Sequence, residues 1–321
     1  MIILSFALLL FALFIKAEKR CDVLIKQKAD LLKALFPFVI ILGHVSFKYP
    51  DSIIKDMRFA GPYVVGIFFF LSGYGLECKR LGGGVARRLK RLFQPLALPL
   101  VTYLLLKGGL CDSVLDEVVD SLKSLTLLLP YTWFVTVIAL FYVVYCVFRN
   151  RFASNREFDA FLIIVTIALF VVLFVLQVDG TMYVSNMSFA MGVMYKQKEQ
   201  WILSKMKMWG WITCVVVVLV CAFAYVQGTP PFHGFAMLAV PLYVAGFMLL
   251  YARVGMCNNR LIRFFKGISY EIYLWQSIPM LVVTSLKINN VWLYAGLIIL
   301  LSVLMAVVSK RLTNKIFCML P

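Results

Sequence analysis

The sequence is poor in charged residues and especially poor in acidic ones. Only 15 of its 321 residues are Asp or Glu, and charged residues make up 15% of the chain, whereas a soluble domain contains about a quarter. Hydrophobic residues account for 63%, and the mean hydropathy is +0.92. This composition excludes an ordinary soluble protein.

Metal ligands and disulfide patterns are also scarce. The chain has two histidines, His44 and His233, and its eight cysteines form no CxxC pair. Zinc and haem sites are built mainly from His and Cys, and disulfide scaffolds from closely spaced cysteines. We therefore expect neither a metal site nor a disulfide scaffold.

Long apolar runs are what the sequence has in abundance. A helix needs roughly 20 apolar residues to cross a bilayer core about 30 Å thick. Several runs are short, so one or two of them could be tilted, re-entrant or sheltered by protein. We predict an all-α fold, a polytopic transmembrane helical bundle of about 10–11 spans. The eleven candidate spans are residues 1–15, 31–47, 59–76, 93–106, 131–148, 159–177, 180–195, 209–226, 233–252, 268–286 and 290–309.

The distribution of cations predicts the orientation. The net charge is +17, but the basic stretches are confined to the segments that separate the apolar runs. We therefore expect no nucleic-acid partner. If the N-terminus lies outside, 26 of the 32 Lys and Arg residues fall in inside segments. Because cytoplasmic segments carry the excess of Lys and Arg, we predict a cytoplasmic C-terminus. The acidic stretch 111–123 is expected to form an amphipathic helix on the outer surface.

The first apolar run stands apart from the others. Residues 1–15 have no basic segment before them and no small-residue cleavage site, which is more typical of an uncleaved anchor than of a secretory signal. A polar stretch separates this run from the next. We assign residues 1–27 to an additional N-terminal anchor helix and cytoplasmic linker, and residues 28–321 to the functional bundle.

Two ionisable residues share the second span. Lys33 and His44 are eleven residues apart, close to three helical turns, so both project from one face about 16 Å apart along the axis. Ionisable groups within a span are functional candidates. Two interpretations are open: a snorkelling lysine with a hydrogen-bonded structural histidine, or a general base, His44, that is reached from the cytoplasm.

The third span and the loop after it contain two further candidate groups. Ser72 and Tyr74 alternate with Gly73 and Gly75, so this segment either packs helices closely or lines a substrate site. The basic cluster that follows is either a topology determinant or a binding site for an anionic ligand on the cytoplasmic side. This cluster consists of Arg80, Arg87, Arg88, Lys90 and Arg91.

The remaining candidates lie in the second half of the bundle. Glu271 is the only carboxylate that we place within a span. We favour a buried pair with Arg263, Lys266 or a basic loop residue over a polar network in a cavity. Trp133 and Tyr142 are interpreted as interfacial or core aromatic residues, and His233 as a loop histidine, because it follows Pro230 and Pro231.

Five blocks, in order, resemble the integral-membrane acyltransferase 3 family, which modifies cell-surface glycans and other acceptors in bacteria. They are the Lys33 to His44 spacing, FFFLSGYGLECKR, RRLKRLFQP, TWFVTVIALFYVVY and ISYEIYLWQSIP. Together they cover about residues 30–280, and the first two are the most specific. The chain departs from the family pattern at Lys33, where Arg is common, and at Gln276, where His is common.

The resemblance implies transfer of an acyl group, usually acetyl, from cytoplasmic acyl-CoA to a hydroxyl of a surface or lipid-linked saccharide in a bacterial-type inner membrane. The basic cluster would bind the CoA phosphates, and the thioester arm would extend past Lys33. His44 would deprotonate the acceptor, and Ser72, Tyr74 or a backbone N–H would stabilise the oxyanion. Glu271, Trp133, Tyr142 and Gln276 are further cavity candidates. The alternative is a non-catalytic glycan exporter.

Overall fold

The computed structural model describes residues 24–79, 84–108, 119–121, 126–205, 208–227, 233–252 and 260–318. Within these ranges the chain is helical and contains no strand. The expected anchor helix at 1–15, most of the expected surface helix at 111–123, and Arg80 lie outside the described residues.

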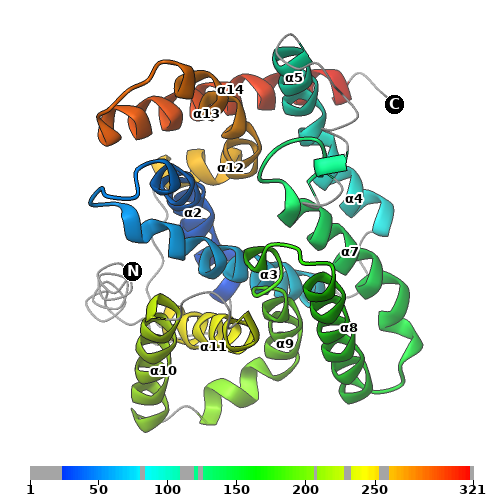
Figure 1. Cartoon of the computed structure of the whole chain (residues 1–321). Helices are drawn as coiled ribbons and strands as arrows, with labels where there is room; N and C mark the ends of the chain where they lie inside the picture. Colours follow the sequence, from blue (N-terminus) through cyan, green and yellow to red (C-terminus); the bar gives the residue numbers. More distant parts are fainter. Residues whose placement is uncertain are drawn as a thin grey trace. The chain divides into compact units, whose positions relative to one another are not determined.

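The helices follow one another along the chain with short 3₁₀ turns between some of them (Figure 1). The α-helices are α2 (Leu24–Lys48), α3 (Ala60–Cys78), α4 (Val85–Phe93), α5 (Ala97–Gly108), α7 (Trp133–Phe148), α8 (Asn155–Val175), α9 (Met187–Lys205), α10 (Met208–Gln227), α11 (His233–Tyr251), α12 (Arg260–Trp275), α13 (Ser277–Ser285) and α14 (Val291–Cys318). The 3₁₀ turns are η1 (Lys55–Phe59), η2 (Gln94–Leu96), η3 (Arg149–Arg151) and η4 (Gly180–Met182).

The apolar runs of the sequence coincide with these helices. Each of the ten predicted spans that fall on described residues overlaps at least one of these helices, which confirms the all-α polytopic fold. Six are long and apolar enough to cross a membrane: Ala29–Lys48, Lys55–Cys78, Val85–Lys107, Trp133–Arg151, Asn155–Val175 and Val291–Thr313. Two shorter apolar helices are Gly210–Cys221 and Ala236–Tyr251.

The predicted span at 268–286 is two helices rather than one. Helix α12 ends at Trp275 and α13 begins at Ser277, with Gln276 between them. Pro279 has no N–H, so the helical hydrogen bond back to the carbonyl of Trp275 is missing. In the new helix the Met280 N–H donates to the Gln276 carbonyl at 3.1 Å. The break therefore places a polar residue where the chain changes helix.

The chain divides into two compact units. Unit 1 comprises residues 1–32, 59–82 and 148–259, and unit 2 comprises residues 33–58, 83–147 and 260–321. In unit 1, α3 packs directly on α9. A Cβ at Gly73 would lie 2.2 Å from the Phe189 carbonyl oxygen, and one at Gly192 would lie 2.1 Å from that of Phe70. Only glycine permits this approach of the two backbones.

Unit 2 has its own apolar core, formed where α2, α12, α13 and α14 meet. Ile41 of α2, Ile272 of α12, Ile278 of α13 and Ile298 of α14 are all buried in this cluster. In Figure 1, α13 and α14 lie next to each other in orange and red, and the contacts between them agree. This core surrounds the residues of α2 and α13 that form the candidate site.

Candidate functional site

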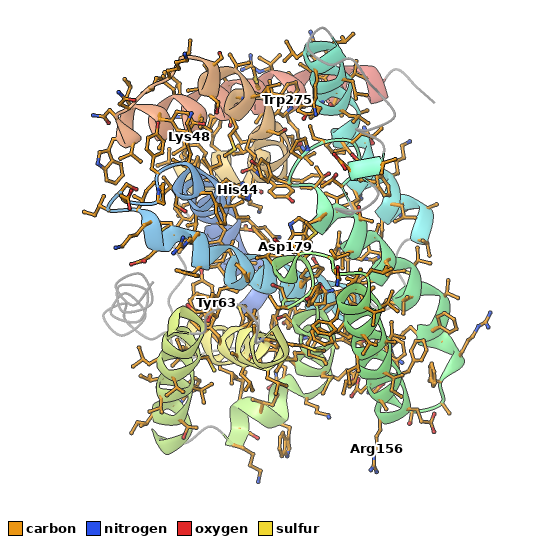
Figure 2. All side chains as sticks on the ribbon, in the orientation of Figure 1. His44, Lys48, Tyr63, Arg156, Asp179 and Trp275 are labelled. Carbon is orange, nitrogen blue, oxygen red and sulfur yellow. The ribbon has the colours of Figure 1, made fainter. Side chains whose placement is uncertain are left out.

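His44 lies one turn before Lys48, near the C-terminal end of α2 (Figure 2). Its Nδ1 is 3.1 Å from Oε1 of Gln276, a side chain that is fully buried between α12 and α13. The two residues are 232 positions apart in the chain. The fold thus brings together two of the residues that the sequence singled out, one from the second span and one from the helix break.

With Oε1 of Gln276 as the partner atom, this hydrogen bond requires one tautomer of the imidazole. A glutamine Oε1 can only accept a hydrogen bond, so Nδ1 of His44 carries the proton and donates it. In the neutral ring the other nitrogen, Nε2, then has a free lone pair. His44 is half-buried, and in this tautomer Nε2 is the ring atom that can accept a proton.

Tyr131 covers one face of the imidazole. The two rings stack with centroids 4.0 Å apart and an angle of 21° between their planes. Tyr131 has φ of 68°, in the left-handed region that non-glycine residues seldom adopt. Its carbonyl oxygen accepts a hydrogen bond from the Tyr273 hydroxyl of α12. Such backbone outliers concentrate at functional sites, where the surroundings hold them in place.

A cavity of about 440 Å³ opens beside His44. This volume lies within the range of small-molecule sites, roughly 300–1,000 Å³. The cavity lies wholly in unit 2, and its walls combine apolar side chains with a few polar ones. The lining residues are His44, Val45, Phe47, Lys48, Tyr103, Pro130, Tyr131, Ser277, Met280, Leu281, Thr284 and Tyr294.

The polar groups of the lining gather at the end of α2. Lys48 is the one acidic or basic side chain in the lining apart from the imidazole, and its Nζ lies 4.3 Å from the centroid of the Tyr294 ring. The hydroxyls of Thr284 and Tyr294 are hydrogen-bonded to each other at 2.7 Å. Burial raises the pKa of Tyr49 in the following loop, with Tyr294 adding to the shift, so this phenol donates a hydrogen bond to the Ile288 carbonyl at neutral pH.

The other predicted site residues of unit 2 are not part of this lining. Lys33 is half-buried near the start of the span, and Trp133 and Tyr142 are half-buried on α7. Of the basic cluster, α4 exposes Arg87, Lys90 and Arg91, whereas Arg88 is half-buried. The proposed contact of this cluster with CoA stays a prediction.

Glu271 is paired, as favoured, but with a partner that the sequence did not name. Lys310 of α14 donates to its carboxylate at 2.6 Å. The expectation that Glu271 is the only carboxylate within a span is wrong. Glu77 lies in the span Lys55–Cys78 and Asp159 in the span Asn155–Val175, and both are buried. Their partners come from distant segments, which hydropathy does not reveal.

In unit 1 the hydroxyl of Tyr74 donates to the carboxylate of Glu199 at 3.0 Å. Glu199 also pairs with Lys196 at 2.6 Å, and Glu77 pairs with Arg149 at 3.1 Å. Ser72 is half-buried on α3. Both of these predicted oxyanion donors belong to unit 1, and the hydrogen of Tyr74 is already used in a bond to a carboxylate. Their catalytic role stays a prediction.

Sequence analysis did not single out Tyr131, Ser277 or Lys48. Tyr131 is only the first residue of the predicted span 131–148. Pro279 was the signal for the helix break, because it removes the bond to the fourth residue before it. This signal marks Ser277 as a residue at a break. No local pattern marks Lys48 as a wall of the same cavity.

Comparisons with known proteins add the family. A family model described as an acyltransferase domain matches residues 27–311. Comparison with curated proteins and with solved structures found no match. Among the described residues no group of three or more His, Cys, Asp or Glu side chains is placed to hold a metal ion. Because the model spans most of the chain, including His44, Gln276 and every residue that lines the cavity, this multi-pass membrane protein belongs to the acyltransferase domain family.

Proposed function

We propose that the protein transfers an acyl group, in the first instance acetyl, from cytoplasmic acyl-CoA to a hydroxyl of a cell-surface or lipid-linked saccharide. The observation that carries this proposal is the hydrogen bond between His44 Nδ1 and Gln276 Oε1 beside a cavity of about 440 Å³. It leaves Nε2 as the basic atom of the ring. Membership of an acyltransferase family supports the type of reaction.

His44 acts as a general base in this mechanism. Nε2 takes the proton of the acceptor hydroxyl while the hydroxyl oxygen attacks the thioester carbonyl carbon. The carbon–sulfur bond then breaks, and the CoA thiolate recovers the proton from the imidazolium. A positioned base of this kind contributes a rate factor of roughly 10² to 10⁴. Tyr131, stacked on the ring, keeps Nε2 in a fixed direction.

The cavity is the proposed acceptor site. By the cation distribution, the loops that follow Lys48 and Leu286 face outside. Lys48, Thr284 and Tyr294 would then lie at the outer ends of their helices and offer hydrogen bonds to a saccharide that enters from that side. Apolar lining residues such as Met280 fit the small acyl group.

The donor is proposed to reach His44 from the opposite side. CoA carries several phosphate charges, and Arg87, Lys90 and Arg91 expose three cations on α4. Guanidinium groups bind phosphate oxygens through paired hydrogen bonds. The pantetheine arm would deliver the thioester along the inner part of α2, which contains Lys33.

The first test measures acyl transfer. The gene for this chain is deleted in the native host and then restored as wild type or variant. Membranes from each strain receive radiolabelled acetyl-CoA, and the base-labile label in the saccharide fraction is counted. Wild type is expected to restore labelling. His44→Ala and His44→Gln are expected to lower the rate by roughly 10² to 10⁴, the general-base factor. His233→Ala, a change at the second of the two histidines, is the matched control.

Wild-type labelling by His44→Ala would remove His44 from the chemistry. Thermal unfolding of the purified protein provides the second measurement, because a bound donor stabilises the folded state. A non-catalytic exporter would show neither labelling nor stabilisation by CoA.

A further inference from the structure

Ser277 has a buried hydroxyl that the mechanism above leaves unused. The residue is 3% exposed, and its Oγ has no hydrogen-bond partner among the described residues. It also lines the cavity beside His44. Buried polar groups are nearly always hydrogen-bonded, because leaving one unpaired destabilises the fold. An unpaired hydroxyl on a residue of the cavity lining is therefore a candidate to bond to an occupant of the cavity.

The position of Ser277 in the chain ties it to the imidazole. It directly follows Gln276, whose side chain holds Nδ1 of His44, and it opens α13. Its neighbours Gln276 and Ile278 are 0% and 1% exposed, so tight packing fixes this stretch. The same helix break thus supplies the residue that bonds to Nδ1 of His44 and a serine that lines the same cavity.

Two other hydroxyls of the lining are engaged. Thr284 and Tyr294 are bonded to each other. Of the residues that line the cavity, Ser277 is the one that contributes a buried side-chain oxygen or nitrogen without a partner. Its hydroxyl makes no hydrogen bond to His44, and so no base is in position to activate it as a nucleophile.

We propose that Ser277 is a further catalytic residue, whose Oγ–H donates a hydrogen bond to the thioester carbonyl oxygen as that oxygen becomes an oxyanion. This inference rests on the proposed acyltransferase function. As the acceptor oxygen bonds to the carbonyl carbon, its proton moves to His44 Nε2 and the carbonyl electron pair moves to the oxygen that Ser277 holds. Collapse re-forms the carbonyl and expels the CoA thiolate, which takes the proton from His44. Ser277 forms and breaks no covalent bond.

The experiment compares variants in the membrane labelling assay at several acetyl-CoA concentrations. Ser277→Ala is expected to lower kcat roughly 10² to 10³-fold, as removal of an oxyanion donor does, with an unchanged KM for acetyl-CoA. Ser277→Thr keeps the hydroxyl and is expected to restore most of the rate. Ser302→Ala is the matched control, because Ser302 on α14 is also a buried serine whose Oγ has no partner in the described part of the chain, yet it is not in the cavity lining. It should keep the wild-type rate.

Each outcome decides the proposal. A wild-type kcat for Ser277→Ala would overturn it, and so would an acetyl adduct on Ser277 in the mass spectrum of protein incubated with acetyl-CoA alone, since that would make Ser277 a nucleophile. Should Ser277→Ala fail to fold, Ser277→Cys replaces it. The thiol is a weaker donor of similar size, so an undiminished rate in that variant would count against the proposal. Absence of labelling by wild type would instead refute the proposed function.

Discussion

At the scale of single residues, the proposed chemistry depends on the pair of His44 and Gln276. The resembled family commonly has histidine at the second position, and this chain has an amide there. A glutamine cannot titrate, but its Oε1 accepts the Nδ1 hydrogen and so keeps Nε2 free of a proton. In the proposed mechanism, Gln276 can therefore orient the base although it cannot titrate.

Replacement of Gln276 tests this orienting role. Gln276→Ala leaves Nδ1 without its acceptor, so both tautomers become accessible. We expect the transfer rate to fall by about tenfold or more, but by no more than the full general-base factor of roughly 10² to 10⁴. Gln276→His supplies a ring nitrogen as acceptor and is expected to stay closer to wild type. Initial rates in the membrane labelling assay measure both. Equal rates for Gln276→Ala and wild type would show that the hydrogen bond does not orient the base.

At the scale of helices, the close packing of α3 and α9 bears on the two interpretations that the sequence left open for one segment of α3. The segment with Ser72, Gly73, Tyr74 and Gly75 was consistent with packing or with a substrate site. Gly73 packs against the α9 backbone, whereas a Cβ at Gly75 would meet nothing within 4 Å. Packing is thus confirmed for Gly73 and is not supported for Gly75.

Alanine substitution at these glycines separates packing from helix propensity. Gly192→Ala would put its Cβ 2.1 Å from the Phe70 carbonyl oxygen, so the two helices must move apart. We expect a destabilisation of roughly 1–3 kcal/mol, as for other overpacked sites. Gly75→Ala is the control, and it is expected to be neutral or to stabilise α3 by up to about 1 kcal/mol through helix propensity. Thermal unfolding in detergent measures both, and the same loss of stability in both variants would contradict the packing argument.

At the scale of the whole molecule, hydropathy predicted the all-α class and the approximate limits of most spans, because apolar length is a local property of the chain. The pairs Glu271–Lys310 and Glu77–Arg149 join residues 39 and 72 positions apart. The bond from His44 to Gln276 joins residues 232 apart. No local pattern reports such contacts. The left-handed backbone of Tyr131 was equally hidden, because its sequence, Pro-Tyr-Thr-Trp, contains no glycine.

The orientation of the chain in the bilayer is open to direct measurement. On a background in which the eight natural cysteines are replaced, Lys287→Cys is expected to react with a membrane-impermeant maleimide in intact cells. Arg311→Cys, beyond the last span, is expected to react only after permeabilisation, because the excess of cations places this end in the cytoplasm. Labelling of Arg311→Cys in intact cells would reverse the predicted orientation and with it the sides assigned to donor and acceptor.

The left-handed backbone at Tyr131 limits how this position can vary in evolution. At φ of 68°, glycine, asparagine and aspartate are tolerated best, and none of them carries a ring that could rest on an imidazole. Substitutions that relieve the left-handed backbone at Tyr131 would therefore remove the ring that covers the His44 imidazole. Descendants of this chain that lose the tyrosine should have acquired another flat side chain nearby, and a comparison of sequenced relatives would reveal whether the two changes arrive together.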